Sequence, residues 1–168
     1  MQKHAENFIK KMDTVLEWIS MVLLACIVVA ATLQVFTRKV LGNSMVGTEE
    51  FARYCFIWMS CIGASLCLTK GMHASIDVLK DKLKGKAVYV HAIVTNIVVL
   101  FVCYVMIFYG FELLGTVSRQ SSPTMGIPMS YIYAALPVSS IFMALSALVK
   151  IGHAVYELRN YSKKEEEE

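Results

Sequence analysis

The chain has 168 residues, of which 57% are hydrophobic and 17% are charged, and its formal net charge is +3. This composition is too apolar for an ordinary soluble domain, in which about 45–50% of residues are apolar. The length leaves no room for a further globular module beside four helices. So small a net charge gives no indication of a nucleic-acid partner.

Four long stretches of the chain contain no Asp, Glu, Lys or Arg: residues 18–37, 54–69, 87–111 and 129–149. A hydrocarbon core about 30 Å thick is crossed by roughly 20 apolar residues in a helix, which satisfies its own backbone polar groups. The sequence therefore predicts an all-α integral membrane protein with four transmembrane helices. With flanking residues included, the predicted spans cover about residues 15–38, 48–70, 87–112 and 129–151. They form one domain over residues 1–160, and a charged tail follows at residues 161–168.

The segment before the first span has apolar residues at roughly helical spacing among charged ones. We expect it to lie on the cytoplasmic membrane surface as an amphipathic helix before the chain turns into the membrane. Because Asp13 and Glu17 interrupt this leader, and the apolar block exceeds the 7–15 residues of a signal peptide, the first span is predicted to be a retained anchor. The apolar residues of the segment are Phe8, Ile9, Met12, Val15 and Leu16.

The second span is predicted to begin with a charged turn. Thr48 can cap the helix, and Glu49 and Glu50 then meet the positive end of the helix dipole. Arg53 is four residues after Glu49 and three after Glu50, so it shares a helix face with both. Later in this span, small residues recur at intervals of four and favour close helix contacts in lipid. They are Ser60 with Ala64, and Gly63 with Cys67.

The connection between the second and third spans is predicted to form a second short amphipathic helix. Ile76, Leu79 and Leu83 follow helical spacing in this segment, and lysines surround them. Such a helix is expected to lie flat on the anionic cytoplasmic leaflet and to contact membrane lipids. The lysines are Lys80, Lys82, Lys84 and Lys86.

The connection between the third and fourth spans, residues 119–130, contains Pro123, Gly126 and Pro128. This composition predicts a stiff, non-helical loop. Pro137 lies inside the fourth span. Because proline lacks a backbone N–H, we expect it to kink that helix.

The positions of the basic residues predict the orientation in the membrane. Twelve Lys and Arg residues lie in the two terminal segments and the middle loop, against four in the other two connections. The positive-inside rule then places both termini in the cytoplasm. Residues 38–53 and 112–128 are expected on the outer face, which is the periplasm in a Gram-negative cell.

The four uncharged stretches lack the groups that pumps and transporters place inside their spans. Apart from tyrosines and cysteines, His91 is their one titratable residue. We therefore expect the four helices to enclose a dry interior, with no catalytic residue, metal site or cofactor. Five cysteines at positions 26, 55, 61, 67 and 103 form no C-x-x-C pair and are predicted to be packing residues.

Two alternatives from other classes remain open at this point. A haem-bearing membrane anchor of a redox enzyme would need axial ligands inside the bilayer, and His91 is a candidate for one of them. A small self-sufficient four-helix transporter would need a membrane-embedded carboxylate if it exchanges protons.

Several sequence strings together resemble the small membrane subunit, or Q subunit, of tripartite ATP-independent periplasmic (TRAP) transporters. The resemblance covers about residues 10–150, and the segment that begins TEEFAR, followed at the expected distance by His73 and IDVL, is its most specific part. Phe56 to Trp58 and Gly63-Ala64 belong to the same pattern. The strings are QVFTRKVL (34–41), TEEFARY (48–54), KGMH (70–73), IDVL (76–79) and SPTMGIP (122–128).

The resemblance implies a bacterial inner-membrane complex of three proteins. A periplasmic binding protein delivers an organic acid, such as a C4-dicarboxylate, a sugar acid or sialic acid. A large multi-span membrane subunit imports it with sodium coupling, and the small subunit braces that subunit and helps to dock the binding protein. Residues expected to contact the large subunit are Arg38, Glu49, Glu50, Arg53, Trp58 and Gly63. Residues expected near the binding protein are Pro123, Thr124, Gly126 and Pro128.

Overall fold

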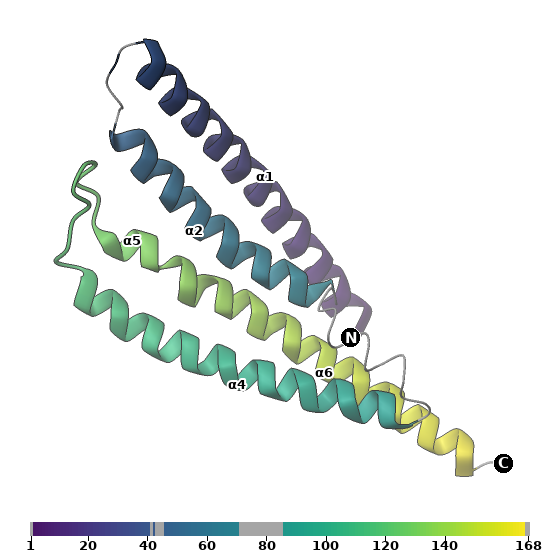
Figure 1. The fold of residues 1–168 in the computed structure, drawn as a ribbon. Helices are drawn as coiled ribbons and strands as arrows, with labels where there is room; N and C mark the ends of the chain where they lie inside the picture. Colours follow the sequence, from purple (N-terminus) through teal and green to yellow (C-terminus); the bar gives the residue numbers. More distant parts are fainter. Residues whose placement is uncertain (1, 41, 43–45, 71–85, 167–168) are drawn as a thin grey trace.

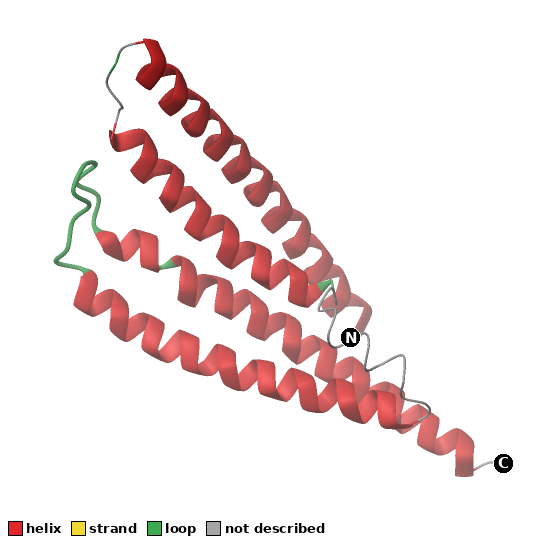
Figure 2. Cartoon of the chain, viewed as in Figure 1, coloured by secondary structure: helices red, strands yellow, loops and turns green. Residues whose placement is uncertain are grey.

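The computed structural model describes residues 2–40, 42, 46–70 and 86–166. Its helices are α1 (Gln2–Val40), α2 (Val46–Thr69), α4 (Lys86–Val117), α5 (Met129–Tyr133) and α6 (Ala135–Glu166). Figure 2 shows helix through nearly all of this part, with the main loop between α4 and α5. The amphipathic helix predicted around Lys80, Lys82 and Lys84 lies outside the described residues, and α4 begins at Lys86.

The described residues contain four helices that are long and apolar enough to cross a membrane. The candidate spans are Asn7–Val40, Gly47–Thr69, Ala87–Val117 and Met129–Arg159. The predicted fold class, an all-α protein with four membrane-spanning helices, is therefore confirmed. The predicted orientation, with both termini inside, stays a prediction.

The long helices lie side by side in a single layer, in the order α1, α2, α6, α4 (Figure 1). Helix α2 packs between α1 and α6, and α4 packs on the other side of α6. Within the described residues α4 contacts neither α1 nor α2, so the helices do not close into a bundle. The prediction of an enclosed dry interior was therefore wrong. Hydropathy reports the environment of each helix, but it does not specify which helices are neighbours.

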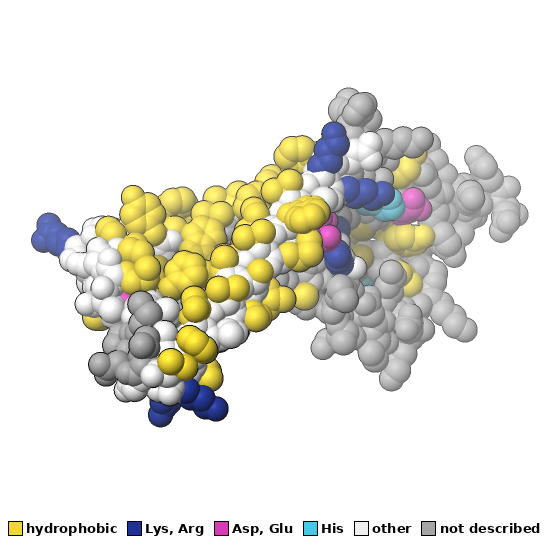
Figure 3. All heavy atoms as spheres, turned by 90° about the horizontal axis from the view of Figure 1, so that it is seen from above, with side chains coloured by type: hydrophobic (Ala, Val, Ile, Leu, Met, Phe, Trp, Pro, Cys, Tyr) yellow, Lys and Arg dark blue, Asp and Glu magenta, His cyan; other side chains and the backbone are white. Residues whose placement is uncertain are grey.

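Large apolar side chains remain uncovered along the layer, and small residues fill the contacts between helices. Phe101 of α4 is 68% exposed, whereas Cys103, two residues later, is fully buried. Ala147 and Ser146 of α6 are also fully buried. Small contact residues are expected where van der Waals packing, not the hydrophobic effect, holds helices together in lipid. Figure 3 shows hydrophobic side chains over the middle of one face, with Lys and Arg toward its two ends.

Helix α1 is continuous over 39 residues, from Gln2 to Val40. The prediction that the N-terminal segment lies flat before turning into the membrane was therefore wrong. No Gly or Pro occurs between these residues, so nothing in the sequence favours a break. Extending an existing helix fixes fewer backbone dihedrals per hydrogen bond than starting a second helix after a turn. One continuous helix is therefore favoured over two helices joined by a turn.

A break separates α5 from α6 at Ala134, three residues before Pro137. Pro137 has no N–H to donate to the carbonyl of Tyr133, so one helical hydrogen bond is absent. The chain continues in helical direction because Ala134 N donates to Ser130 O at 2.9 Å and Val138 N donates to Ala134 O at 3.2 Å. The span is thus interrupted near Pro137, close to the end that the α4–α5 loop joins, and the predicted kink itself stays a prediction.

Candidate functional site

The predicted polar residues of α2 and the α4–α5 loop meet at one end of the layer, which we call the outer end. Helix α2 begins at Val46, so Thr48 lies in its first turn and does not precede it, as a cap would. Glu49 Oε1 lies 2.9 Å from Arg53 Nη2, and both side chains are more than half exposed. Arg53 thus pairs with Glu49 along one helix face, as the i,i+4 spacing predicts.

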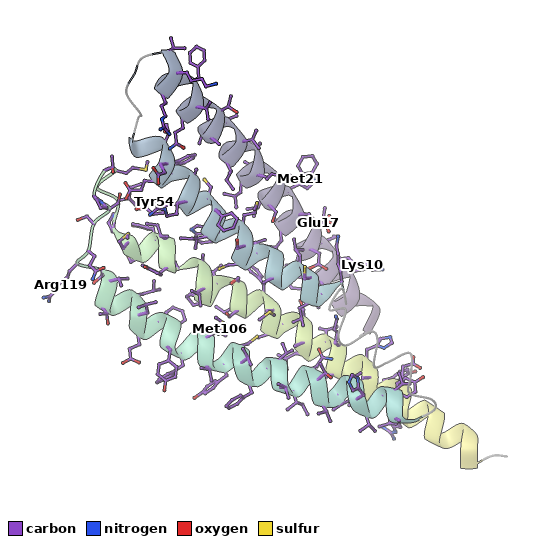
Figure 4. The ribbon with its side chains drawn as sticks, in the orientation of Figure 1. Lys10, Glu17, Met21, Tyr54, Met106 and Arg119 are labelled. Atoms are coloured by element: carbon purple, nitrogen blue, oxygen red, sulfur yellow. The ribbon has the colours of Figure 1, made fainter. Side chains whose placement is uncertain are left out.

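Glu50 forms hydrogen bonds with Tyr54 and with the α4–α5 loop. The hydroxyl of Tyr54 donates to Oε1 of Glu50 at 2.5 Å. The backbone N–H groups of Thr124 and Met125 donate to Oε2 at 3.1 and 3.2 Å. Figure 4 places Tyr54 at this end of α2, beside the loop that connects α4 to α5. Both oxygens of Glu50 are therefore hydrogen-bonded within this chain.

The loop that Glu50 contacts is compact and non-helical, as predicted. Ser122 N donates to Ile127 O at 2.9 Å, and Gly126 N donates to Ser122 O at 3.1 Å. Gly126 has a φ of 65°, a conformation that a residue without Cβ adopts at little cost. Ser122 is buried, and its Oγ accepts from Met125 N at 3.1 Å. The loop is therefore held both by its own bonds and by α2.

An apolar groove of about 580 Å³ runs between α1 and α2 and reaches the tip of this loop. Met125 extends from the loop to line it, so α1, α2 and the loop share one surface at the outer end. The lining is almost wholly apolar, as a surface facing lipid or a partner helix requires. Its residues are Val22, Ala25, Cys26, Val29, Ala30, Leu33, Gly47, Thr48, Phe51 and Met125.

The structure brings Glu50 together with Thr124, but it leaves the other predicted residues apart. Arg38 is exposed near the end of α1, and Trp58 is half-buried on α2. At Gly63 a Cβ would meet nothing within 4 Å, so no other described helix packs against that position. Pro123, Gly126 and Pro128 are exposed on the loop, as is Thr124. Their contacts with partner proteins stay predictions.

A second set of polar contacts, at the opposite end of the layer, was missed by the sequence interpretation. Lys70 Nζ lies 2.7 Å from Glu17 Oε1, which joins α2 to α1. Thr69 Oγ1 donates to Ser146 Oγ at 3.0 Å, and Lys150 Nζ donates to Leu68 O, which joins α2 to α6. The sequence offered a signal in Glu17, an acidic residue within a helical turn of the first apolar block, but it gave no indication of its partner.

The fold and these contacts define a small integral membrane protein whose polar contacts join helices and loops. A family model described as "Tripartite ATP-independent periplasmic transporters, DctQ component" matches residues 27–156, which is most of the chain. The chain therefore belongs to the DctQ family of TRAP transporter components. The resemblance noted in the sequence is confirmed.

Relatives of the chain are also named as TRAP transporter permease proteins. The chain is 29% identical to the sialic acid TRAP transporter small permease protein SiaQ of Vibrio cholerae, over 84% of this chain and 82% of that protein. It is 28% identical to the C4-dicarboxylate TRAP transporter small permease protein DctQ of Rhodobacter capsulatus, over 67% of this chain and 51% of that protein. Part of a longer protein also matches, the sialic acid TRAP transporter permease protein SiaT of Haemophilus influenzae, at 26% identity over 82% of this chain and 22% of SiaT.

The protein is thus a non-catalytic small permease subunit of the inner membrane, and its transporter includes a large permease component. Membership of this family accounts for the four membrane-capable helices. It also explains why the resemblance extends across nearly the whole chain.

Proposed function

We propose that this subunit braces the large permease subunit and helps to dock a periplasmic binding protein during the import of an organic acid. The single layer of helices is the observation that supports this proposal best. A layer offers one broad face to a neighbouring protein and the other to lipid, whereas a closed bundle would use much of its apolar surface internally. Small residues and interfacial polar groups suit such packing in the membrane.

The contacts at the two ends of the layer support a brace of fixed shape. At the outer end, Glu50 holds the α4–α5 loop against α2. At the opposite end, Thr69 and Lys70 hold α2 to its neighbours on both sides. Hydrogen bonds of this kind between membrane helices contribute about 0.6 kcal/mol each on average, so several together limit sliding of the helices.

The proposed contacts with the large subunit are made by Arg38, Glu49, Arg53, Trp58 and Gly63. The side chains of the Glu49–Arg53 pair are both more than half exposed, so they are accessible to a partner protein. Gly63 leaves space for close approach of a partner helix. The sequence interpretation also placed Glu50 in this set. Because both of its oxygens already accept hydrogen bonds within the chain, we do not include Glu50 among the proposed contacts with the large subunit.

We propose that sodium coupling and acid binding belong to the large subunit. Ion and substrate sites near the bilayer midplane are typically formed by paired discontinuous helices. The described spans contain one break, between α5 and α6, and it lies near the outer end. The acid is proposed to be a C4-dicarboxylate, a sugar acid or sialic acid, and two of these classes appear in the names of the relatives.

Assembly can be tested by co-purification of the tagged large subunit with this chain. Arg53→Glu places two acidic groups one turn apart and removes the cation that a partner would contact, so we expect recovery of the complex to fall several-fold. Arg119→Glu, a charge reversal at the same end of the layer, is the matched control and is expected to leave recovery unchanged. Equal recovery of the two variants would contradict the proposed contact.

Transport can be tested in liposomes that contain the large subunit with or without this chain, supplied with the binding protein. Each candidate acid is added in turn, with an inward gradient of sodium or of potassium. We expect uptake of one acid class that requires sodium and all three proteins. Uptake catalysed by this chain alone, or equal uptake without it, would rule out the bracing function.

A further inference from the structure

The tip of the α4–α5 loop is fixed by a side chain from another helix. Two consecutive amides, those of Thr124 and Met125, donate to the same oxygen of Glu50. These residues are 74 and 75 positions from Glu50 in the chain. The other oxygen of Glu50 accepts from Tyr54, one turn further along α2, so the carboxylate is itself held in place.

These bonds determine where the loop tip lies relative to the helices. A hydrogen bond to a carboxylate is in general stronger than one between neutral groups, and here two amides share one carboxylate oxygen at 3.1 and 3.2 Å. The loop's own bonds, such as that from Ser122 N to Ile127 O, fix its internal shape but not its position over α2. Thr124 also lies close to Gly47, where an added Cβ would be 3.8 Å from its methyl group. Glu50 is thus the charged contact that seats the tip on the first turn of α2.

We propose that Glu50 is a positioning residue for docking: it holds residues 121–128 in the conformation that the periplasmic binding protein contacts. This inference rests on the docking role proposed above and adds a specific residue to it. Pro123 and Thr124 are exposed at the tip, beside the two amides that Glu50 holds. A loop that is already ordered loses less conformational entropy on binding, so the complex forms at lower concentrations of the partner.

The test is the dependence of uptake on the concentration of binding protein, measured with the complete transporter and the acid identified in the liposome experiment above. Glu50→Ala removes the acceptor of the Thr124 amide and leaves the Met125 amide with Ser122 Oγ as its acceptor within the loop. We expect the half-saturating concentration of binding protein to rise about tenfold. Glu50→Gln keeps a carbonyl acceptor and is expected to raise it about twofold to threefold. The maximal uptake rate and recovery of the complex are expected to stay unchanged in both variants.

Two further variants make the result specific. Glu112→Gln removes one negative charge from the exposed end of α4 that precedes the loop, and it is expected to behave as the unaltered chain. Pro123→Trp places a bulky group on the loop surface and tests docking itself. If Pro123→Trp has no effect on the half-saturating concentration, the docking role fails. If it has an effect and Glu50→Ala has none, the docking role survives and the positioning by Glu50 is overturned.

A fall in complex recovery with Glu50→Ala would also overturn the inference, because Glu50 would then act in assembly with the large subunit. Amide hydrogen exchange of the full chain in detergent gives an independent measurement. We expect the peptide that contains Thr124 and Met125 to exchange at least tenfold faster in Glu50→Ala. Unchanged exchange would show that Glu50 does not hold the loop.

Discussion

Lys70, directly after the last residue of α2, forms an ion pair with Glu17 of α1 across 2.7 Å, between Nζ and Oε1. The two side chains are 47% and 38% exposed, so solvent weakens the attraction. The pair fixes the end of α2 against a helix that contacts little else in the layer, because α1 packs mainly against α2. It is therefore a polar contact at one end of the interface between the first two spans.

Glu17→Gln is expected to destabilise the protein only slightly, because both side chains of the pair are partly exposed to solvent. The loss should shrink as salt is raised, since salt screens exposed pairs. Unfolding in mixed detergent micelles at low and high salt measures both effects. The double variant Glu17→Lys with Lys70→Glu reverses the pair and should recover most of the loss. No recovery would show that the two groups do not interact.

Gly110 lies where α4 approaches Pro137 of α6 closely. A Cβ at this position would lie 3.2 to 3.4 Å from three ring atoms of Pro137, which is buried and cannot move as a flexible side chain can. Gly110→Ala is therefore expected to destabilise the protein by about 1–3 kcal/mol through overpacking.

The matched control for this substitution is Gly115→Ala on the same helix. A Cβ there would meet nothing within 4 Å, so alanine should leave stability unchanged or raise it by up to about 1 kcal/mol. Unfolding of both variants in mixed micelles gives the comparison. Equal effects of the two substitutions would contradict the close packing of α4 on Pro137.

The hydroxyls of Thr69 and Ser146 join α2 to α6 at 3.0 Å, and Ser146 is fully buried. A double-mutant cycle with Thr69→Val and Ser146→Ala isolates their interaction. We expect a coupling energy of about 0.6 kcal/mol, the average for hydrogen bonds between membrane helices. Strictly additive effects of the two substitutions on unfolding would show that the bond does not contribute.

The orientation predicted from the basic residues can be tested by labelling with a membrane-impermeant thiol reagent. In a background without the five native cysteines, Ser121→Cys on the α4–α5 loop should react in cells with a permeabilised outer membrane. Arg159→Cys near the end of α6 should react only after the inner membrane is opened. The reverse pattern would invert the topology and place the proposed docking loop in the cytoplasm.

The local features at the outer end of the layer were predicted well from the sequence, because they depend on residues that are close together in the chain. The shared face of Glu49 and Arg53 follows from helical spacing, and the non-helical loop follows from Pro123, Gly126 and Pro128. It did not predict that Glu50 would hold Thr124 instead of remaining free for a partner. The two residues are 74 positions apart, and no local pattern specifies which loop covers the first turn of α2.

The sequence by itself determined that four apolar segments must become membrane helices, since lipid leaves their backbone groups no other partners. It also determined the break in the last span, because Pro137 lacks a donor wherever its helix lies. Only the tertiary structure decided that the helices form an open layer and that α1 continues unbroken from Gln2. Small and apolar residues occur on every span. Hydropathy therefore places all four spans in lipid but does not specify which spans are neighbours. The order of neighbours depends instead on contacts between distant residues, such as Gly110 with Pro137 and Thr69 with Ser146.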